Sequence, residues 1–428
     1  MRKVSSAIRP STHRPADAAA GRTGQAVYVH RRSVLLAARD GISLGIPLPT
    51  PYRIRVDDEI LQDLRERLAR TRWPDEVDDA DWDYGTNLAY LRSLCAYWLD
   101  EFDWRAQERK LNELPNFRAD VDGLGIHFVH VRGRGADPLP LVITHGWPST
   151  FFEVLKLVPL LTAATASEGE PEESFDVVIP SLPGFGFSDR PVDRFVHARV
   201  PELWVELMHE LGYERFGACG GDLGGGIAAR LGQRHPDTVI GIHVTNVYGS
   251  IAEGDLPPTD AERRYFEQQL QWECEEGGYE HLQSTRPQSA AYGLNDSPAG
   301  LAAWIVEKYR AWSDCDGHVD QAFTRDELLT NITIYWATQT VASSFRPYWD
   351  SHNNPHPAPW TRITVPCGIA IFPSDLGRPP REFAERSYNV QRWTEMPRGG
   401  HFAALEQPKL LASDIREFFR ELRDRPGV

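Results

Sequence analysis

Asp222 has the residue type and the neighbours needed for nucleophilic chemistry. It stands in a glycine-rich stretch, residues 216–231, whose layout is typical of a sharp strand-to-helix turn that presents a nucleophile. Such a turn strains the backbone and leaves little room, and Gly220 and Gly224 supply small neighbours two residues to either side. The N-terminus of the following helix stabilises an ionised carboxylate. Asp222 is therefore predicted to attack without first losing a proton to a base.

Taken alone, this stretch also fits a helix-capping aspartate in a glycine-rich turn, or a phosphate-binding loop. A phosphate loop would continue with Lys-Ser/Thr, which is absent here. An acidic ribose partner about twenty residues further on, as in dinucleotide-binding folds, is also absent. The choice between a nucleophile and a turn therefore depends on the residues that accompany Asp222.

Two downstream residues complete a candidate triad with Asp222. Asp375 follows an apolar strand, and His401 lies in a Gly-Gly-His-Phe loop before the last helix. Alone, Asp375 fits a turn and His401 a structural histidine. The order nucleophile, acid, histidine is that of α/β-hydrolases.

Upstream, residues 145–148 (His-Gly-Trp-Pro) follow another strand, where the α/β-hydrolase fold supplies a backbone N–H to an oxyanion hole. We interpret the N–H groups of Trp147 and Leu223 as the two oxyanion donors. His145 is interpreted as a structural residue that shapes the loop presenting Trp147.

The elements that must position these residues alternate between apolar strands and amphipathic helices. Apolar runs predict strands at residues 139–144, 175–180, 239–244 and 364–372, and a hairpin is predicted within 117–131 with Gly123 and Gly125 at its turn. This alternation predicts a mostly parallel, doubly wound α/β sheet.

The remaining segments add helices around this sheet. The expected organisation is a flexible basic tail (1–46), an N-terminal meander domain (47–115), a first core part (116–249), an inserted helical lid (250–355) and a second core part (356–428). In the meander, Asp57 is the expected cap of a first helix, a second helix contains Leu88, and the aromatic stretch at 102–104 is expected to be loop. In the lid, helices are expected at 259–276, at 301–312 and after a capping box that starts at Thr324.

Composition narrows the possible partners. The 428 residues include 46 basic and 61 acidic side chains, a net charge of −15 that argues against nucleic acid or an anionic membrane. Five scattered cysteines without a CxxC motif indicate reduced thiols in a cytoplasm and no zinc site. No apolar run is long enough to span a bilayer. The basic residues 1–46 fit a transit peptide or, as we prefer, a disordered tail.

From about Tyr52 to its end, the chain resembles the microsomal-type epoxide hydrolases with an N-terminal meander, a group that includes insect juvenile hormone epoxide hydrolases and bacterial biosynthetic members. The segments that carry the resemblance are residues 102–105, 124–128, 145–148, 181–188, 220–224, 278–279, 296–303, 328–331, 372–373 and 399–404.

The resemblance implies an α/β-hydrolase fold and the roles of the site residues. Asp222 would be the nucleophile, His401 the base and Asp375 the orienting acid, with Tyr279 and Tyr348 as lid tyrosines. Mammalian relatives carry glutamate at the position of Asp375, and either carboxylate can do this work. Most relatives have tryptophan where this chain has Leu223, a change that affects the shape of the pocket more than the mechanism.

The implied reaction converts a small-molecule epoxide and water to a vicinal diol through an alkyl ester on Asp222. It requires no metal and no cofactor, and a homodimer is possible in this family. A haloalkane dehalogenase would share Asp222 but would need halide donors, so Leu223 and the paired tyrosines count against it. An esterase would carry serine at this position, and a catalytically silent ligand-binding hydrolase fold stays open as an alternative.

Overall fold

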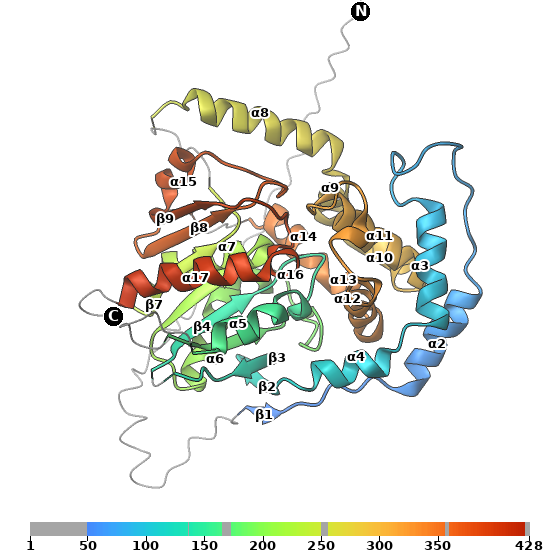
Figure 1. Ribbon diagram of the computed structural model, residues 1–428, viewed down its shortest axis with the longest axis horizontal. Helices are drawn as coiled ribbons and strands as arrows, with labels where there is room; N and C mark the ends of the chain where they lie inside the picture. The colour runs from blue at the N-terminus through green and yellow to red at the C-terminus, as the bar shows by residue number, and fades with distance from the viewer. Residues whose placement is uncertain (1–48, 136, 165–172, 250–255, 356–358, 424–428) are drawn as a thin grey trace, which may run out of the picture. The chain divides into compact units, whose positions relative to one another are not determined.

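The computed structural model describes residues 49–135, 137–164, 173–249, 256–355 and 359–423, and a nine-stranded sheet organises them (Figure 1). The strand order is β1-β2-β3-β5-β4-β6-β7-β8-β9. Strands β1, β2, β3 and β5 pair antiparallel, and the pairs from β5 to β9 are parallel. The strands are β1 (Thr50–Pro51), β2 (Asn116–Val121), β3 (Leu124–Val131), β4 (Leu139–Thr144), β5 (Phe175–Pro180), β6 (Phe216–Gly220), β7 (Val239–Val244), β8 (Pro366–Ile371) and β9 (Asn389–Glu395).

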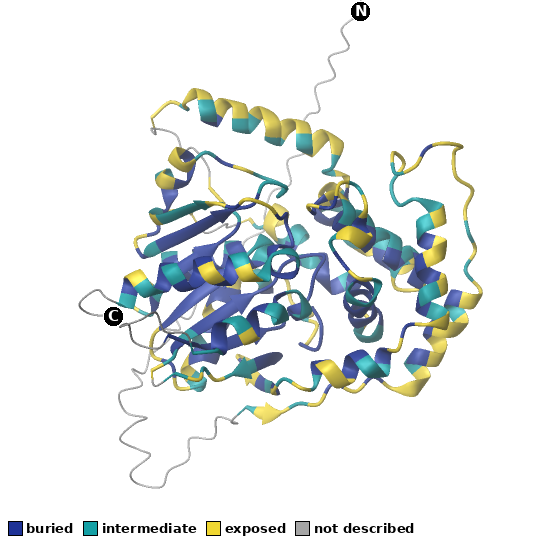
Figure 2. Ribbon diagram, viewed as in Figure 1, coloured by how far each residue is buried: buried dark blue, intermediate teal, exposed yellow. Residues whose placement is uncertain are grey.

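The central strands form where the sequence has continuous apolar runs. All six residues of β5 are buried, as are five of the six in β4, because helices cover both faces of the parallel part (Figure 2). The predicted strands at 139–144, 175–180 and 239–244 are confirmed residue for residue. In the hairpin, Gly123 lies at the turn with φ +81°, whereas Gly125 lies within β3.

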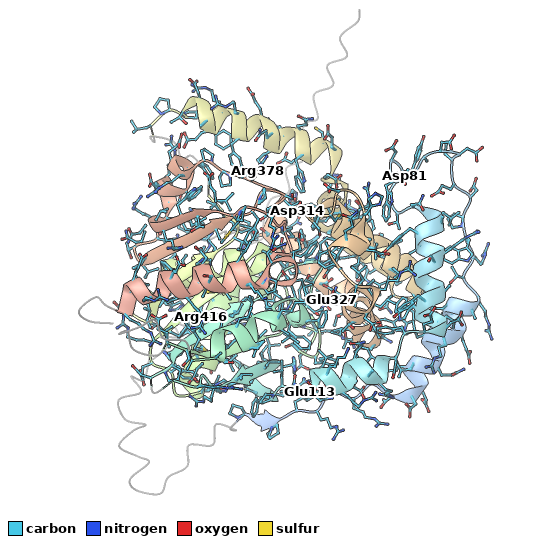
Figure 3. The ribbon with its side chains drawn as sticks, in the orientation of Figure 1. Asp81, Glu113, Asp314, Glu327, Arg378 and Arg416 are labelled. Carbon is cyan, nitrogen blue, oxygen red and sulfur yellow. The ribbon has the colours of Figure 1, made fainter. Side chains whose placement is uncertain are left out.

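The helices of the core pack their apolar sides on the sheet. Helix α17 shows this most clearly, since Leu411, Ile415, Phe418 and Leu422 are buried at helical spacing. From the same helix, Arg416 (labelled in Figure 3) donates to the carbonyl oxygens of residues 160, 161 and 163 at the end of α5. The core helices are η2 (Phe151–Leu157), α5 (Val158–Thr162), η3 (Val196–Arg199), α6 (Val200–Glu210), α7 (Asp222–Arg234), α15 (Arg381–Ser387), α16 (Ala403–Glu406) and α17 (Pro408–Arg423).

Between β7 and β8 most of the described residues are helical, as expected for a lid. The capping box at Thr324 is present, with its hydroxyl and the Glu327 carboxylate each accepting a backbone N–H. A second capping box, formed by Thr259 and Glu262, opens α8. The lid helices are α8 (Asp260–Glu275), α9 (Gly278–Thr285), α10 (Pro287–Leu294), α11 (Pro298–Ala311), η4 (Val319–Gln321), α12 (Arg325–Thr338), α13 (Val341–Ser344) and α14 (Arg346–Asn353).

The N-terminal meander contains three helices, α2 (Asp58–Ala69), α3 (Leu88–Asp100) and α4 (Trp104–Leu111). Asp57 occupies the expected cap position of α2, but its side chain makes no capping hydrogen bond. The expectation of loop at 102–104 is wrong at its end, because the Asp103 side chain accepts the N–H of Ala106 and so starts α4.

The predicted tail at residues 1–46 lies outside the described residues. Residues 47–428 form one compact unit, so the division into meander, two core parts and lid stays a prediction about organisation along the chain. Among the helices that the structure describes, none combines the length and the apolar character that crossing a bilayer requires.

Candidate active site

Asp222 lies at the turn from β6 into α7, as predicted. Its φ of +49° is in the left-handed region that non-glycine residues rarely adopt. The Asp222 N–H donates to Oδ1 of Asn246 at 2.7 Å, which holds the turn. The flanking glycines are required by close approach, since a Cβ on Gly220 would meet the backbone of Gly224, and one on Gly224 would meet the carbonyl oxygen of Thr144.

The Asp222 carboxylate accepts hydrogen bonds from the two predicted oxyanion donors. The Trp147 N–H donates to its Oδ1 at 2.8 Å, and the Leu223 N–H is the second backbone donor. Gly146 makes this contact possible, because a side chain there would collide with Asp222. The two N–H groups thus lie at the carboxylate, where the negative charge of a tetrahedral intermediate would develop.

His401 connects the two carboxylates of the triad. Its Nδ1 lies 2.7 Å from Oδ1 of Asp375, and its Nε2 lies 3.7 Å from Oδ2 of Asp222. Asp375 is itself fixed by the N–H of Leu376 at 2.7 Å and by the amide of Asn246 at 3.0 Å. The structure therefore brings together the three residues that the sequence predicted.

Burial and neighbouring charges shift the pKa values of His401 and Asp222 in the triad. Burial alone would lower the pKa of His401, but the charge and hydrogen bond of Asp375, followed by the charge of Asp222, raise it to about 9. Burial raises the pKa of Asp222 above its ordinary value, against the charge of His401 and the two N–H groups. The loss of hydration therefore outweighs the stabilisation that the helix N-terminus, the two N–H groups and His401 give the ionised carboxylate.

The two lid tyrosines face Asp222 from different helices, Tyr279 from α9 and Tyr348 from α14. The Tyr279 ring stacks on Trp147 with centroids 5.1 Å apart, and the Tyr348 ring meets Trp147 edge-on at 5.9 Å. Burial, and next the charge of Asp222, raise the pKa of both phenols well above the ordinary value. Both phenols therefore stay protonated and can act as hydrogen-bond donors.

Asp222, His401, Tyr279 and Tyr348 line a cavity of about 360 Å³, here called the Asp222 cavity. Its walls come from α7, from the loop after β7 and from the lid helices α8, α9 and α14. Such a volume fits a small organic molecule. Its reactive contents are the Asp222 carboxylate, the His401 imidazole and the two phenols; Leu223, Tyr248, Pro347 and Ser351 are further lining residues.

His145 is placed as a structural residue, in agreement with the prediction. Its Nε2 accepts the Leu182 N–H at 3.2 Å, and its Nδ1 lies 3.2 Å from the carbonyl oxygen of Gly146, so Nδ1 carries the proton. Burial lowers the pKa of His145 to about 4, which keeps the ring neutral.

Four further residues support the site and were missed by sequence reasoning. Asn246 bridges the Asp222 N–H and the Asp375 carboxylate, and its only signal was its place just after a buried strand. The Glu406 carboxylate accepts N–H groups on both sides of His401, from Gly400 and Phe402, each at 3.0 Å.

The third, Glu153, lines a cavity of about 30 Å³ together with His401, enough space for one water molecule. Burial raises the pKa of Glu153 to about 7. Nearby, Asp314 (labelled in Figure 3) accepts the N–H of Gly399 at 2.8 Å, which further orders the His401 loop.

No group of three or more His, Cys, Asp or Glu side chains within the described ranges is arranged to hold a metal ion.

Comparison with known proteins agrees with this geometry. Residues 49–154 match the family described as "Epoxide hydrolase N terminus", and residues 140–275 match "alpha/beta hydrolase fold". A putative epoxide hydrolase of Stigmatella aurantiaca is 44% identical over 379 residues, which cover 87% of this chain and 85% of the relative. The chain belongs to the epoxide hydrolase family. Epoxide hydrolase 1 of Sus scrofa is 37% identical, over 86% of this chain and 88% of that protein.

Solved structures of the same family share the fold. The juvenile hormone epoxide hydrolase of the silkworm Bombyx mori superposes with a TM-score of 0.78 at 29% identity, covering 89% of this chain and 95% of that one. The epoxide hydrolase of Aspergillus niger superposes with a TM-score of 0.76 at 28% identity, covering 89% of this chain and 98% of that one. The α/β-hydrolase fold and the epoxide hydrolase resemblance inferred from the sequence are both confirmed.

Proposed function

We propose that this epoxide hydrolase converts a small-molecule epoxide to a vicinal diol with Asp222 as nucleophile and His401 as base. The observation that carries the proposal is the position of the Asp222 carboxylate. One of its oxygens accepts the Trp147 N–H, the other lies 3.7 Å from His401 Nε2, and both share a cavity with two protonated tyrosines.

In the first step, a carboxylate oxygen of Asp222 attacks a ring carbon, and the carbon–oxygen bond of the epoxide breaks. The departing alkoxide is strongly basic and takes a proton from Tyr279 or Tyr348. The raised pKa values of the two phenols support this role, because the phenols are protonated before the reaction. The product of the step is an alkyl ester on Asp222.

In the second step, water attacks the ester carbonyl while His401 accepts its proton. The N–H groups of Trp147 and Leu223 hold the developing oxyanion, and each such donor is typically worth about 3 kcal/mol. When the intermediate collapses, the ester C–O bond breaks and the leaving alkoxide takes the proton back from His401. The proton of the new Asp222 carboxyl group restores the tyrosine, so the diol leaves and the carboxylate is regenerated. Asp375 orients the imidazole and stabilises its charged form.

Esterification itself prepares the base for the second step. The negative charge of Asp222 is one of the causes that raise the pKa of His401, and that charge disappears when the ester forms. The pKa of His401 then falls, so a larger fraction of the imidazole is neutral and able to accept a proton.

Two further predictions concern the cellular location and the oligomeric state of the enzyme. A cytoplasmic location is supported by the five cysteines, all of which are unpaired thiols in the structure. A homodimer is carried over from the family alone.

The decisive experiment compares Asp222→Asn with His401→Gln. Asp222→Asn should form no covalent adduct, because an amide is not a competent nucleophile. His401→Gln should be alkylated and should then accumulate the ester, seen as an intact-mass increase equal to the mass of the epoxide. Turnover of epoxides by Asp222→Ala at the parent rate would overturn the proposal.

A further inference from the structure

A second cavity adjoins the Asp222 cavity. It has a volume of about 450 Å³ and is here called the Trp360 cavity; its walls come from η3, α6, α7, α14 and the segment around Trp360. Four residues line both cavities: Leu223, Tyr248, Pro347 and Ser351. The two spaces therefore share one wall, which these four residues form.

Leu223 is the residue of this wall that stands beside the reacting atoms. It follows Asp222 directly, and its N–H donates to the Asp222 carboxylate while its side chain faces both cavities. A substituent on the ring carbon under attack therefore meets Leu223 within a few bonds.

The Trp360 cavity offers a ligand mainly apolar surface. Its three charged side chains already have partners. Arg230 donates to Gln233 and the Pro359 carbonyl oxygen, Arg234 donates to Glu202 and the Ala198 carbonyl oxygen, and the Asp350 carboxylate accepts the Phe195 N–H. The Arg230 guanidinium also lies over the Trp360 ring, 4.2 Å from its centroid. The remaining lining includes Phe195, Pro201, Leu223, Ile227 and Pro347.

The Trp360 cavity also borders α7 at a glycine. Gly226 lines the cavity one turn after Asp222, and a Cβ there would lie 3.6 Å from the Tyr248 ring, an ordinary contact. A Cβ at this position therefore displaces no neighbour, and a larger side chain would extend into the cavity.

We propose that the two cavities form one substrate site and that the substrate is an epoxide with a long apolar arm. The epoxide ring lies between Asp222 and the two tyrosines, and the arm passes Leu223 into the Trp360 cavity. The inference rests on the proposed function. Each methylene that leaves water on binding improves kcat/KM by about fourfold, so a buried arm makes the enzyme strongly selective for chain length.

The test uses a chain-length series, the terminal epoxides of propane, hexane and dodecane. For the parent protein, kcat/KM should rise steeply along the series. Ala198→Trp places an indole at the exposed rim of the Trp360 cavity, away from Asp222, and should lower the ratio of kcat/KM for the dodecane and propane epoxides at least about tenfold. Gly226→Leu, which fills the same cavity from α7, should act in the same direction.

Ala96→Trp is the matched control, since Ala96 is an exposed alanine on α3 and lines neither cavity. It should leave the ratio at the parent value. A ratio that does not rise with chain length in the parent, or that is unchanged in both cavity-filling variants, would overturn the two-cavity site. Failure of the parent to turn over any of the three epoxides would instead contradict the proposed function.

Discussion

The pKa of His401 depends most on one neighbour, Asp375. Its charge and its hydrogen bond are the first causes that raise this pKa, against burial, to about 9. Asp375→Asn should therefore lower the pKa of His401, and the rise in single-turnover ester hydrolysis with pH should move to lower pH. The rate itself should fall by orders of magnitude, because the imidazole loses its orientation.

Asp375→Glu is the matched control for this prediction, because it keeps the charge. Its pH profile should stay close to that of the parent protein. The profile is measured by quenching the alkylated enzyme at several pH values and following loss of the adduct mass. A profile that does not move in Asp375→Asn would contradict the assigned coupling between Asp375 and His401.

At this scale, the sequence revealed the residues that carry a local signature. Asp222 stands between paired glycines, and His401 stands in a loop before the last helix, so each was found from its neighbours. Sequence reasoning did not find Asn246 and Glu153, because they reach the site only through contacts between segments that are remote in the chain. It did not find Glu406 because this residue acts through backbone N–H groups. A polar residue after a buried strand is too common to be assigned a role from sequence.

At the scale of elements, Asp414 of α17 joins the helix to two strands. Its carboxylate, 3% exposed, accepts from His243 of β7 at 2.8 Å and from Arg392 and Thr394 of β9 at 2.6 and 2.7 Å. Burial alone would raise the pKa of Asp414, but these partners lower it to about 2. The carboxylate is therefore ionised in the folded protein at neutral pH.

Asp414→Asn should destabilise the protein by roughly 3–5 kcal/mol near neutral pH, because it leaves buried partners without their counter-charge. The folded-state pKa lies below the ordinary value of 3.8, so this stabilisation is present above that pH and lost as the pH falls toward about 2. Urea unfolding measured across this pH range should show that the difference in free energy of unfolding between parent and variant becomes smaller in acid. Asp260→Asn, on the exposed side of α8, is the control and should leave the unfolding midpoint unchanged.

The elements that the sequence predicted are those with strong periodicity. Helix α17 and strands β4, β5 and β7 have apolar runs or stripes that burial confirms. Strand β9 was missed because it is a half-exposed edge strand with mixed polarity, and the short lid helices α9, α10, α13 and α14 were missed because tertiary packing rather than a long repeat defines them.

At the scale of the whole molecule, a chain of contacts runs from the meander to the nucleophile. The Trp98 indole N–H of α3 donates to Thr333 Oγ1 of α12 at 3.1 Å. From the same lid helix, the Asn331 amide donates to the carbonyl oxygen of Pro148, and the Tyr335 hydroxyl donates to that of Ser149, each at 2.9 Å. These carbonyls follow Trp147, whose N–H holds Asp222. The meander thus braces the lid helix that fixes the oxyanion loop.

Thr333→Val tests the contact between Trp98 and Thr333, because valine has nearly the same shape as threonine but no hydroxyl group. Both Trp98 and Thr333 are buried, so the variant leaves the indole N–H without an acceptor and should cost about 1–3 kcal/mol of stability. Thr333→Ser keeps the hydroxyl and should retain most of that stability. The midpoint of urea unfolding is measured for both variants, together with the rate of ester formation on Asp222. If Thr333→Val unfolds at the same urea concentration as the parent protein, the indole contact does not couple the meander to the lid.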